Sequence, residues 1–200
     1  MADHYYTNNP SVESNRQSFD FMLNETKFSF ITDAGVFSKK EIDFGSRLLI
    51  ETFVSPETDG GILDVGCGYG PIGISIAKRY NDKQITMVDV NERALQLATE
   101  NAEKNQVKNV TVLKSFIYES VQNNKYAAIL SNPPIRAGKK VVHEILENAF
   151  DRLVDKGELW IVIQKKQGAP SAIDKLTDVF DEVEVVVKKK GYYIIKAKKG

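Results

Sequence analysis

Apolar residues along most of the chain fall into two alternating patterns. Short, nearly unbroken apolar runs are typical of buried strands, and apolar residues spaced three and four apart are typical of helices that cover a sheet. Because the two patterns alternate, the sequence predicts an α/β fold with a doubly wound, mostly parallel sheet. The predicted strands are residues 62–65, 84–89, 110–114, 126–130 and 158–163, and the predicted helices are residues 70–80, 92–105 and 140–154, the last ending at the glycine signal of residues 155–157.

The C-terminal segment departs from this alternation. Residues 183–187 and 192–195 are apolar and flank the sequence Lys-Lys-Lys-Gly. This pattern predicts a hairpin, which would complete a seven-stranded sheet with antiparallel strands. We interpret the lysines at 188–190 and 196–199 as a solvated sheet edge that discourages pairing with other chains, in preference to an RNA-binding surface.

The N-terminal segment has its own pattern. Residues 27–31 and 36–37 flank Thr-Asp-Ala-Gly, which predicts another hairpin, and residues 42–54 have helical spacing. So short a segment makes a poor core by itself. We therefore expect residues 1–55 to be a hairpin-helix extension packed on a domain of residues 56–200, with a single domain overall.

Composition narrows the class of protein. The 27 basic residues balance the 27 acidic residues, so no overall field attracts a nucleic acid or a membrane. Cys67 is the single cysteine, which excludes a disulfide framework and suits a reducing compartment. His4 and His143 lack partners at metal-ligand spacing, so we predict no metal site. Without a leader pattern or a run of eighteen apolar residues, we expect a soluble, cytoplasmic protein.

A glycine-rich loop follows the first core strand, in Asp64-Val-Gly-Cys-Gly-Tyr-Gly70. Glycines at 66, 68 and 70 accept positive φ and carry no Cβ, so a ligand can approach the backbone closely. Asp89 follows about twenty residues on and can accept hydrogen bonds from ribose hydroxyls. These features predict an adenosine-containing ligand. The Asp64 carboxylate would repel a pyrophosphate but suits an ammonium group and a sulfonium centre.

The motif formed by Asp64, Gly66, Gly68 and Gly70 resembles the first motif of class I S-adenosylmethionine-dependent methyltransferases. The resemblance implies a Rossmann-like fold with S-adenosyl-L-methionine bound by these residues and Asp89. Relatives commonly carry an acid for the adenine amine where this chain has Phe116. Adenine would then be held by backbone groups and apolar contact.

The sequence Ser-Asn132-Pro133-Pro134 ends the apolar run of residues 126–130 with a stiff loop. In the same family, Asn-Pro-Pro at this place marks enzymes that methylate nitrogen on a planar system. Such a nitrogen is a poor nucleophile because its lone pair is delocalised. If the Asn132 side-chain oxygen and the Pro133 carbonyl each accept one N–H, they aim the nitrogen at the methyl group and stabilise its developing charge.

Longer strings, residues 132–139, 32–39 and 42–49, are similar to methyltransferases that modify guanine N2 in small-subunit ribosomal RNA, and this resemblance runs from about residue 28 to the end. It implies ribosomal RNA or the small subunit as partner, no membrane, and a monomer as the working expectation. The extension would fold over the cofactor, with Asp43 and Ser46 close to the site. The substrate contacts it implies are Phe37, Pro134, Ile135 and Arg136, with Ile135 replacing the usual aromatic residue and Arg136 suited to a phosphate.

Three alternatives stay open. Methylation of a protein glutamine amide uses the same planar nitrogen chemistry. A nicotinamide dehydrogenase is compatible with Gly68-x-Gly70-x-x-Gly73 but leaves the proline loop unexplained. Phe116 and Ile135 favour a non-catalytic, cofactor-binding module for RNA binding or ribosome assembly.

Overall fold

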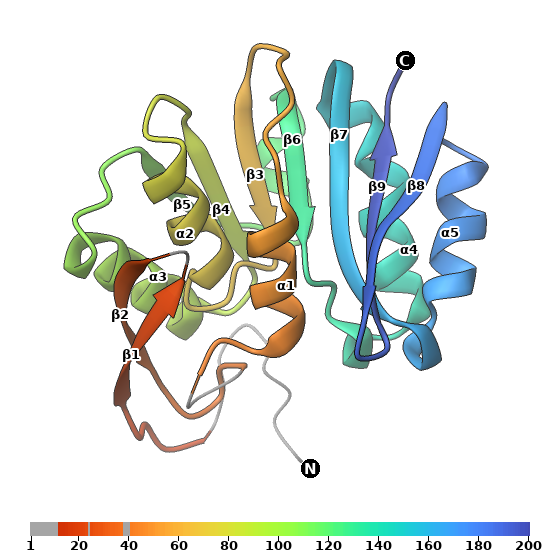
Figure 1. The fold of residues 1–200 in the computed structure, drawn as a ribbon. Coiled ribbons are helices and arrows are strands. Elements are labelled where there is room, and N and C mark those ends of the chain that lie inside the picture. Colours follow the sequence, from red (N-terminus) through yellow and green to blue (C-terminus); the bar gives the residue numbers. More distant parts are fainter. Residues whose placement is uncertain (1–11, 24, 38–40) are drawn as a thin grey trace.

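A seven-stranded sheet forms the centre of the protein, with helices on both faces (Figure 1). The computed structural model describes residues 12–23, 25–37 and 41–200. The strand order is β5-β4-β3-β6-β7-β9-β8, in which β9 runs antiparallel to both β7 and β8 and the other neighbours are parallel. The strands are β3 (Gly61–Val65), β4 (Ile85–Asp89), β5 (Val110–Lys114), β6 (Tyr126–Ser131), β7 (Leu153–Gln164), β8 (Glu182–Lys189) and β9 (Tyr192–Lys198). The predicted fold class and the C-terminal hairpin are confirmed.

Two apolar layers hold the helices on the sheet. Successive residues of β3 point to opposite faces, so Ile62 belongs to one buried cluster and Leu63 to the other. The first cluster includes residues of α1, α2 and α3, and the second includes residues of α4 and α5. The helices are α1 (Phe44–Thr52), α2 (Pro71–Arg79), α3 (Glu92–Lys104), α4 (Lys139–Asn148) and α5 (Ala169–Thr177), with short 3-10 helices η1 (Glu119–Val121), η2 (Ile135–Ala137), η3 (Phe150–Arg152) and η4 (Lys165–Gln167). None of the described helices has the length and apolar character needed to cross a membrane.

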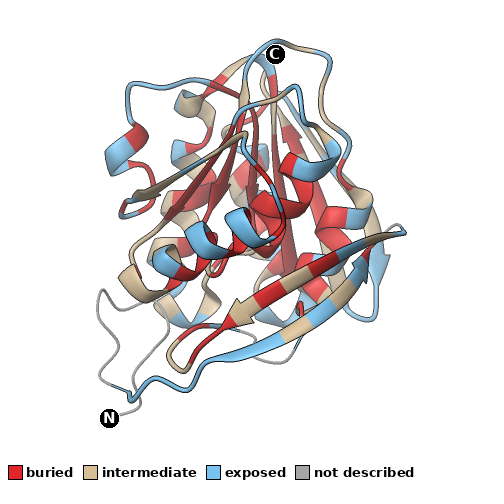
Figure 2. Ribbon diagram, turned by 90° about the vertical axis from the view of Figure 1, so that its left-hand side faces the viewer, coloured by how far each residue is buried: buried red, intermediate tan, exposed pale blue. Residues whose placement is uncertain are grey.

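The N-terminal hairpin pairs β1 (Gln17–Leu23) with β2 (Thr26–Thr32). The predicted pairing of residues 27–31 with residues 36–37 was wrong. Residues 36–37 form no strand, because the turn before them is held by α3: the Ala34 and Gly35 carbonyls accept hydrogen bonds from Arg93 and Asn91. Figure 2 shows the hairpin as more exposed than the sheet: exposed and intermediate positions alternate in β1 and buried and intermediate positions alternate in most of β2, whereas β3, β4 and β6 are almost entirely buried.

Two asparagines attach this hairpin to the core. The Asn101 side chain accepts from Ile31 N (2.7 Å) and donates to Ile31 O (2.9 Å). Asn105, the C-cap of α3, makes the same pair of bonds with Ser29 N (2.9 Å) and Ser29 O (2.8 Å). The two amides thus satisfy backbone groups on the edge of β2 that would otherwise lack partners.

Two further expectations near the C-terminus were wrong or incomplete. The helix predicted over residues 140–154 ends at Asn148, and β7 already begins at Leu153. Gly157 does not end that helix; it lies inside β7, where a Cβ would meet Val154 O at 2.8 Å. The sequence reading also missed α5, although Gly168 and a proline at the first turn are ordinary signals of a helix start.

Candidate active site

A cavity of about 340 Å³ opens at the carboxyl ends of the central parallel strands. This is where ligands bind in doubly wound sheets, and the volume falls in the range of small-molecule sites. Its walls come from the loops that follow β3, β4, β5 and β6, and from the segment before α1. The cavity therefore joins residues from the N-terminal extension to residues of the central sheet.

The glycine loop between β3 and α2 forms the floor of the cavity. Gly66 and Gly68 line it and adopt φ of +74° and +57°. A Cβ at either position would meet no atom within 4 Å, so both backbones face open space. Gly70 does not line the cavity; it turns the chain into α2, and a Cβ there would lie 2.7 Å from Ile74 Cδ1. The floor is thus bare backbone that a ligand can approach.

Asp89 ends β4 at the side of this floor. Its carboxylate accepts hydrogen bonds from Gly68 N (2.8 Å) and Asn91 N (2.9 Å). Burial raises the pKa of Asp89, and these backbone N–H groups together with that of Val90 act against the rise. Because one carboxylate bridges the glycine loop and the start of α3, the floor and its acid are held as one unit.

Asp64 lies behind the floor and does not line the cavity. Its side chain is buried; Oδ2 accepts from Gly73 N (2.8 Å), while Oδ1 has no hydrogen-bond partner among the described residues. Burial raises the pKa of Asp64 to about 7, the charge of Asp89 adds to the rise, and the Gly73 hydrogen bond opposes it. Asp64 therefore braces the first turn of α2 from below.

Asn132, Pro133 and Pro134, which follow β6, form a wall of the cavity. The wall is fixed to the floor because the Ser131 hydroxyl donates to Val65 O (2.8 Å) in the neighbouring strand β3. The Asn132 side-chain nitrogen lies 3.0 Å from Ser46 Oγ and 3.3 Å from Asp43 Oδ2. Asp43 and Ser46 also line the cavity, so α1 contributes its first turn to the site.

The partners of Asn132 decide which way its amide points. An ionised carboxylate can only accept hydrogen bonds, so the NH2 end of the Asn132 amide has to face Asp43. The carbonyl oxygen then points away from Asp43 and is left as an acceptor at the cavity wall. Asp43 is itself fixed, because as N-cap of α1 it accepts from Ser46 N (3.1 Å).

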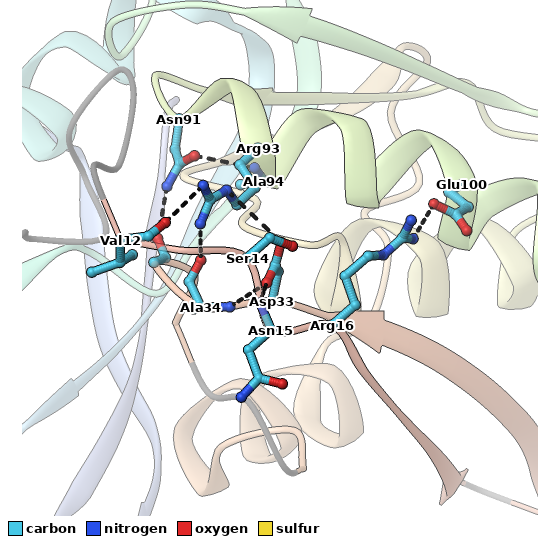
Figure 3. Close-up of polar contacts among 11 residues, drawn as sticks. Val12, Ser14, Asn15, Arg16, Asp33, Ala34, Asn91, Arg93, Ala94 and Glu100 are labelled. Carbon is cyan, nitrogen blue, oxygen red and sulfur yellow. Dashed lines mark hydrogen bonds and ion pairs between the residues drawn. The ribbon is translucent and has the colours of Figure 1, made fainter.

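A covering segment, residues 33–37, closes one side of the cavity with Val36 and Phe37. It is tied to the start of α3, where Arg93 donates to Ala34 O (2.6 Å) and Val12 O (3.0 Å) and pairs with Asp33 (Figure 3). Asn91, which caps α3, donates to Gly35 O (3.0 Å). The segment is therefore anchored next to Asp89.

Most residues expected at the site do surround the cavity. Gly66, Gly68, Asp89, Phe116, Phe37, Asn132, Pro133 and Pro134 line it, whereas Asp64, Gly70, Ile135 and Arg136 do not. Ile135 packs on the second apolar cluster, and Arg136 is exposed beside the wall. The sequence did not single out Val90, Ala137 or Val141, which supply apolar lining from loops and from α4. These three residues can be recognised as part of the site only from their neighbours in the folded protein. Within the described residues, no group of three metal-ligating side chains comes together.

Comparisons with known proteins agree with this architecture. The model of the methyltransferase small domain matches residues 27–196. A Bacillus subtilis (strain 168) protein named "Uncharacterized protein YbxB" is 62% identical over the full length of both chains. A ribosomal RNA small subunit methyltransferase C of Aeromonas hydrophila is 37% identical over 142 residues, covering 69% of this chain and 40% of that one.

Among solved structures, "T. Thermophilus 16S rRNA N2 G1207 methyltransferase (RsmC) in complex with AdoMet and Guanosine" superposes with a TM-score of 0.82 at 21% identity, covering 96% of this chain and 52% of that one. The chain spans about half the length of the curated methyltransferase C relatives that it matches. The fold is the Rossmann-like fold of methyltransferases. The chain belongs to the methyltransferase small-domain family.

Proposed function

We propose that the protein is an S-adenosylmethionine-dependent methyltransferase that transfers a methyl group to the exocyclic N2 amine of a guanine in small-subunit ribosomal RNA, in the cytoplasm. The observation that carries the proposal is the Asn132 amide, held by Asp43 and Ser46 with its oxygen left as an acceptor at the cavity wall. The names of its relatives support the RNA substrate.

The floor of the cavity fits S-adenosylmethionine. Gly66 and Gly68 leave room for a ligand against the backbone, and Asp89 offers a carboxylate to ribose hydroxyls. Val90 and Phe116 give an apolar surface for adenine. The Asp89 carboxylate at the cavity floor and the buried Asp64 behind it favour a positively charged ligand. When bound, the cofactor supplies a methyl group made electrophilic by its sulfonium.

The wall formed by Asn132, Pro133 and Pro134, which we call the acceptor wall, fits an amine on a flat ring. The Asn132 side-chain oxygen and the Pro133 carbonyl would each accept one N–H of guanine N2, which fixes the nitrogen in the orientation needed for transfer. Transfer leaves this nitrogen positively charged until it gives up a proton, and the two oxygens stabilise that charge. The rigid prolines keep both acceptors in place, so this wall requires no strong base.

The rim of the cavity fits the rest of the nucleotide. Phe37 lines the cavity and is 42% exposed, so its ring can contact the face of a guanine. This would compensate for Ile135, which packs against the second apolar cluster and does not line the cavity. Pro134 adds apolar lining, and Arg136 beside it is suited to a phosphate.

The test is methylation of small-subunit particles from a strain that lacks the gene, with labelled S-adenosylmethionine and mass spectrometry of the ribosomal nucleosides. We expect N2-methylguanosine with the wild-type protein and a loss of about 100-fold or more with Asn132→Ala, while cofactor affinity by calorimetry is unchanged. Label in protein would favour the glutamine-amide alternative. Binding of a nicotinamide cofactor instead would favour a dehydrogenase, and cofactor binding without any label would favour a non-catalytic module.

A further inference from the structure

Three segments of the chain bring positive charge to the edge of the sheet that carries Asn132. The segments that follow β6 and β7 lie at this edge because both strands are parallel. Since β9 is antiparallel to β7 and β8 is antiparallel to β9, β8 also ends at this edge, as Figure 1 shows. The basic residues there are Arg136, Lys139 and Lys140 after β6, Lys165 and Lys166 after β7, and Lys188, Lys189 and Lys190 at the β8–β9 turn. We refer to these eight residues as the basic rim.

Specific contacts join the rim to the acceptor wall. Lys165 N donates to Gly191 O (2.8 Å), so η4 lies directly against the β8–β9 turn. That turn is anchored beside the start of α1, where the Lys190 ammonium lies 4.9 Å from the centre of the Phe44 ring. Phe44 follows Asp43, the partner of Asn132. The rim therefore starts at the acceptor wall and extends outward across the ends of β6, β7, β9 and β8, a span of roughly 14 Å from the usual strand spacing.

The charge of the seven rim lysines is not neutralised by acids that the structure describes. All eight residues are exposed, and the segments 135–141, 164–170 and 187–193 contain no Asp or Glu. None of the seven lysines is in an ion pair with an acid that the structure describes. By contrast, Lys114 pairs with Glu92 on the other half of the same edge, and Lys196 pairs with Glu184 in the β8–β9 hairpin. A zero net charge thus conceals a concentrated local field.

We propose that the basic rim binds the phosphate backbone of the RNA strand that flanks the methylated nucleotide; this rests on the proposed function and adds the path of the RNA. A strand of regularly spaced negative charges matches exposed lysines that are distributed along an edge and pair with none of the described acids. Protein partners and membranes usually need an apolar anchor. The large exposed apolar residues of the described chain, Val12, Met22, Phe37, Val54 and Phe116, all lie outside the three rim segments.

The test compares two charge-reversing double variants. Lys166→Glu with Lys189→Glu alters the rim and spares Lys188 and Lys190, whose ammonium groups lie over the Tyr193 and Phe44 rings. Lys108→Glu with Lys156→Glu makes the same change in net charge at exposed lysines near the starts of β5 and β7, at the opposite edge. Binding of a labelled single-stranded fragment of small-subunit ribosomal RNA is measured by fluorescence anisotropy over a salt series, alongside calorimetry with S-adenosylmethionine.

We expect the rim variant to bind RNA about tenfold more weakly at low salt, and the slope of log K against log salt to become shallower by about 1.4, which corresponds to two lost phosphate contacts on a single strand. The control should stay within about twofold of wild type, and cofactor affinity should not change in either variant.

Different outcomes separate the two proposals. If the wild type binds and methylates RNA and the rim variant matches it, the rim proposal is overturned and the proposed function stands. If the rim variant binds naked RNA normally but loses methylation of intact subunits, the rim contacts a ribosomal protein instead, and the RNA path is wrong. If the wild type neither binds nor methylates RNA, the proposed function fails and the rim proposal fails with it.

Discussion

Asp43 and Asn132 lie 89 positions apart in the chain, yet the Asn132 side-chain nitrogen is 3.3 Å from an oxygen of the Asp43 carboxylate. The residue that caps α1 thereby determines the orientation of an amide at the end of β6. If the amide were reversed, two oxygens would face each other. The extension therefore does more than cover the site. It determines that the oxygen of the Asn132 amide, and not its nitrogen, would face the amine that is to be methylated.

The first prediction separates this orienting role from the capping role of Asp43. Serine caps helices about as well as aspartate but is too short to reach Asn132, so Asp43→Ser should keep stability within about 1 kcal/mol. We expect its kcat to fall by about tenfold or more, with the KM for S-adenosylmethionine unchanged. Asp43→Asn retains both a cap and an acceptor and should recover part of the loss. The measurements are steady-state methylation kinetics and thermal unfolding.

A different pattern would show that Asp43 is merely structural. In that case kcat would follow the melting temperature across Asp43→Ser, Asp43→Asn and Asp43→Ala. Asp43→Ala serves as the matched variant, because it removes the cap together with the acceptor and should cost about 1 kcal/mol more than Asp43→Ser.

The second prediction contrasts Gly68 of the glycine loop with Gly73 in the first turn of α2. A Cβ at Gly68 meets nothing within 4 Å, but φ is +57° and the methyl group would project from the cavity floor. Gly68→Ala should thus cost only about 1–2 kcal/mol of stability while weakening S-adenosylmethionine binding by about tenfold or more. A Cβ at Gly73 would overlap Met87 Sδ and approach Asp64 Oδ2 at 3.1 Å. Gly73→Ala should mainly destabilise, by about 1–3 kcal/mol. Urea unfolding and calorimetry distinguish the two; equal effects on both quantities would contradict the contrast.

The third prediction concerns the pH dependence of stability. The folded-state pKa of Asp64 is about 7, against an ordinary value of 3.8, because the side chain is buried. Between these values the folded protein keeps a proton that the unfolded chain has lost, so the free energy of unfolding falls as pH rises through this window. Asp64→Asn should flatten the decline and be more stable than wild type above about pH 7, by roughly 4 kcal/mol at most. Asp89, whose pKa is also raised, leaves a residual slope.

Asp33 provides a control, because its pKa is shifted in the opposite direction from that of Asp64. Burial favours its neutral form, but hydrogen bonds from Ser14, Asn15 and Ala34 and the charge of Arg93 outweigh burial and lower the pKa of Asp33. The stability that Asp33 contributes is therefore present at neutral pH and lost as pH falls through its folded-state pKa. Asp33→Asn should destabilise at neutral pH and flatten the acid side of the profile. Urea unfolding between about pH 3 and about pH 8 measures both variants. If the free energy of unfolding of the wild type rose between pH 3.8 and about pH 7, the raised pKa of Asp64 would be refuted.

The core strands could be predicted from sequence because buried parallel strands are continuous apolar runs, as in residues 126–130. The N-terminal hairpin could not, because β1 is half polar and its pairing depends on contacts far away in the chain. Asn101 of α3 and its C-cap Asn105 bind the edge of β2. Arg93 donates to the carbonyl of Ala34, in the turn that the sequence predicted to be part of the hairpin. Nothing local to residues 27–37 reveals these partners.

The residues of the site likewise include some that the sequence predicts and some whose contacts depend on packing. Gly66, Gly68 and Asp89 are encoded in short motifs whose spacing reveals a common sheet edge, and Asn132 is marked by the prolines that follow it. The contact of Asn132 with Asp43 instead requires α1 to pack over the sheet beside β7 and β9. Asp64 shows the converse, since its motif predicts a ligand contact whereas its side chain lies behind the cavity. Motifs predict which residues lie at the same edge of the sheet, but packing determines which of their side chains line the cavity.

The last prediction concerns the covering segment. Arg93 uses two guanidinium nitrogens to hold the carbonyls of Ala34 and Val12 while it pairs with the buried Asp33 (Figure 3). Lysine keeps the charge beside Asp33 but lacks the fork that binds two carbonyls at once. Arg93→Lys should therefore loosen the segment carrying Phe37, and S-adenosylmethionine should dissociate about tenfold faster because charge-assisted hydrogen bonds contribute about 1.5–3 kcal/mol each. Stopped-flow displacement measures this rate. Arg16→Lys is the matched control, since Arg16 pairs with Glu100 at the exposed surface. Equal rates in the two variants would mean that the segment does not retain the cofactor.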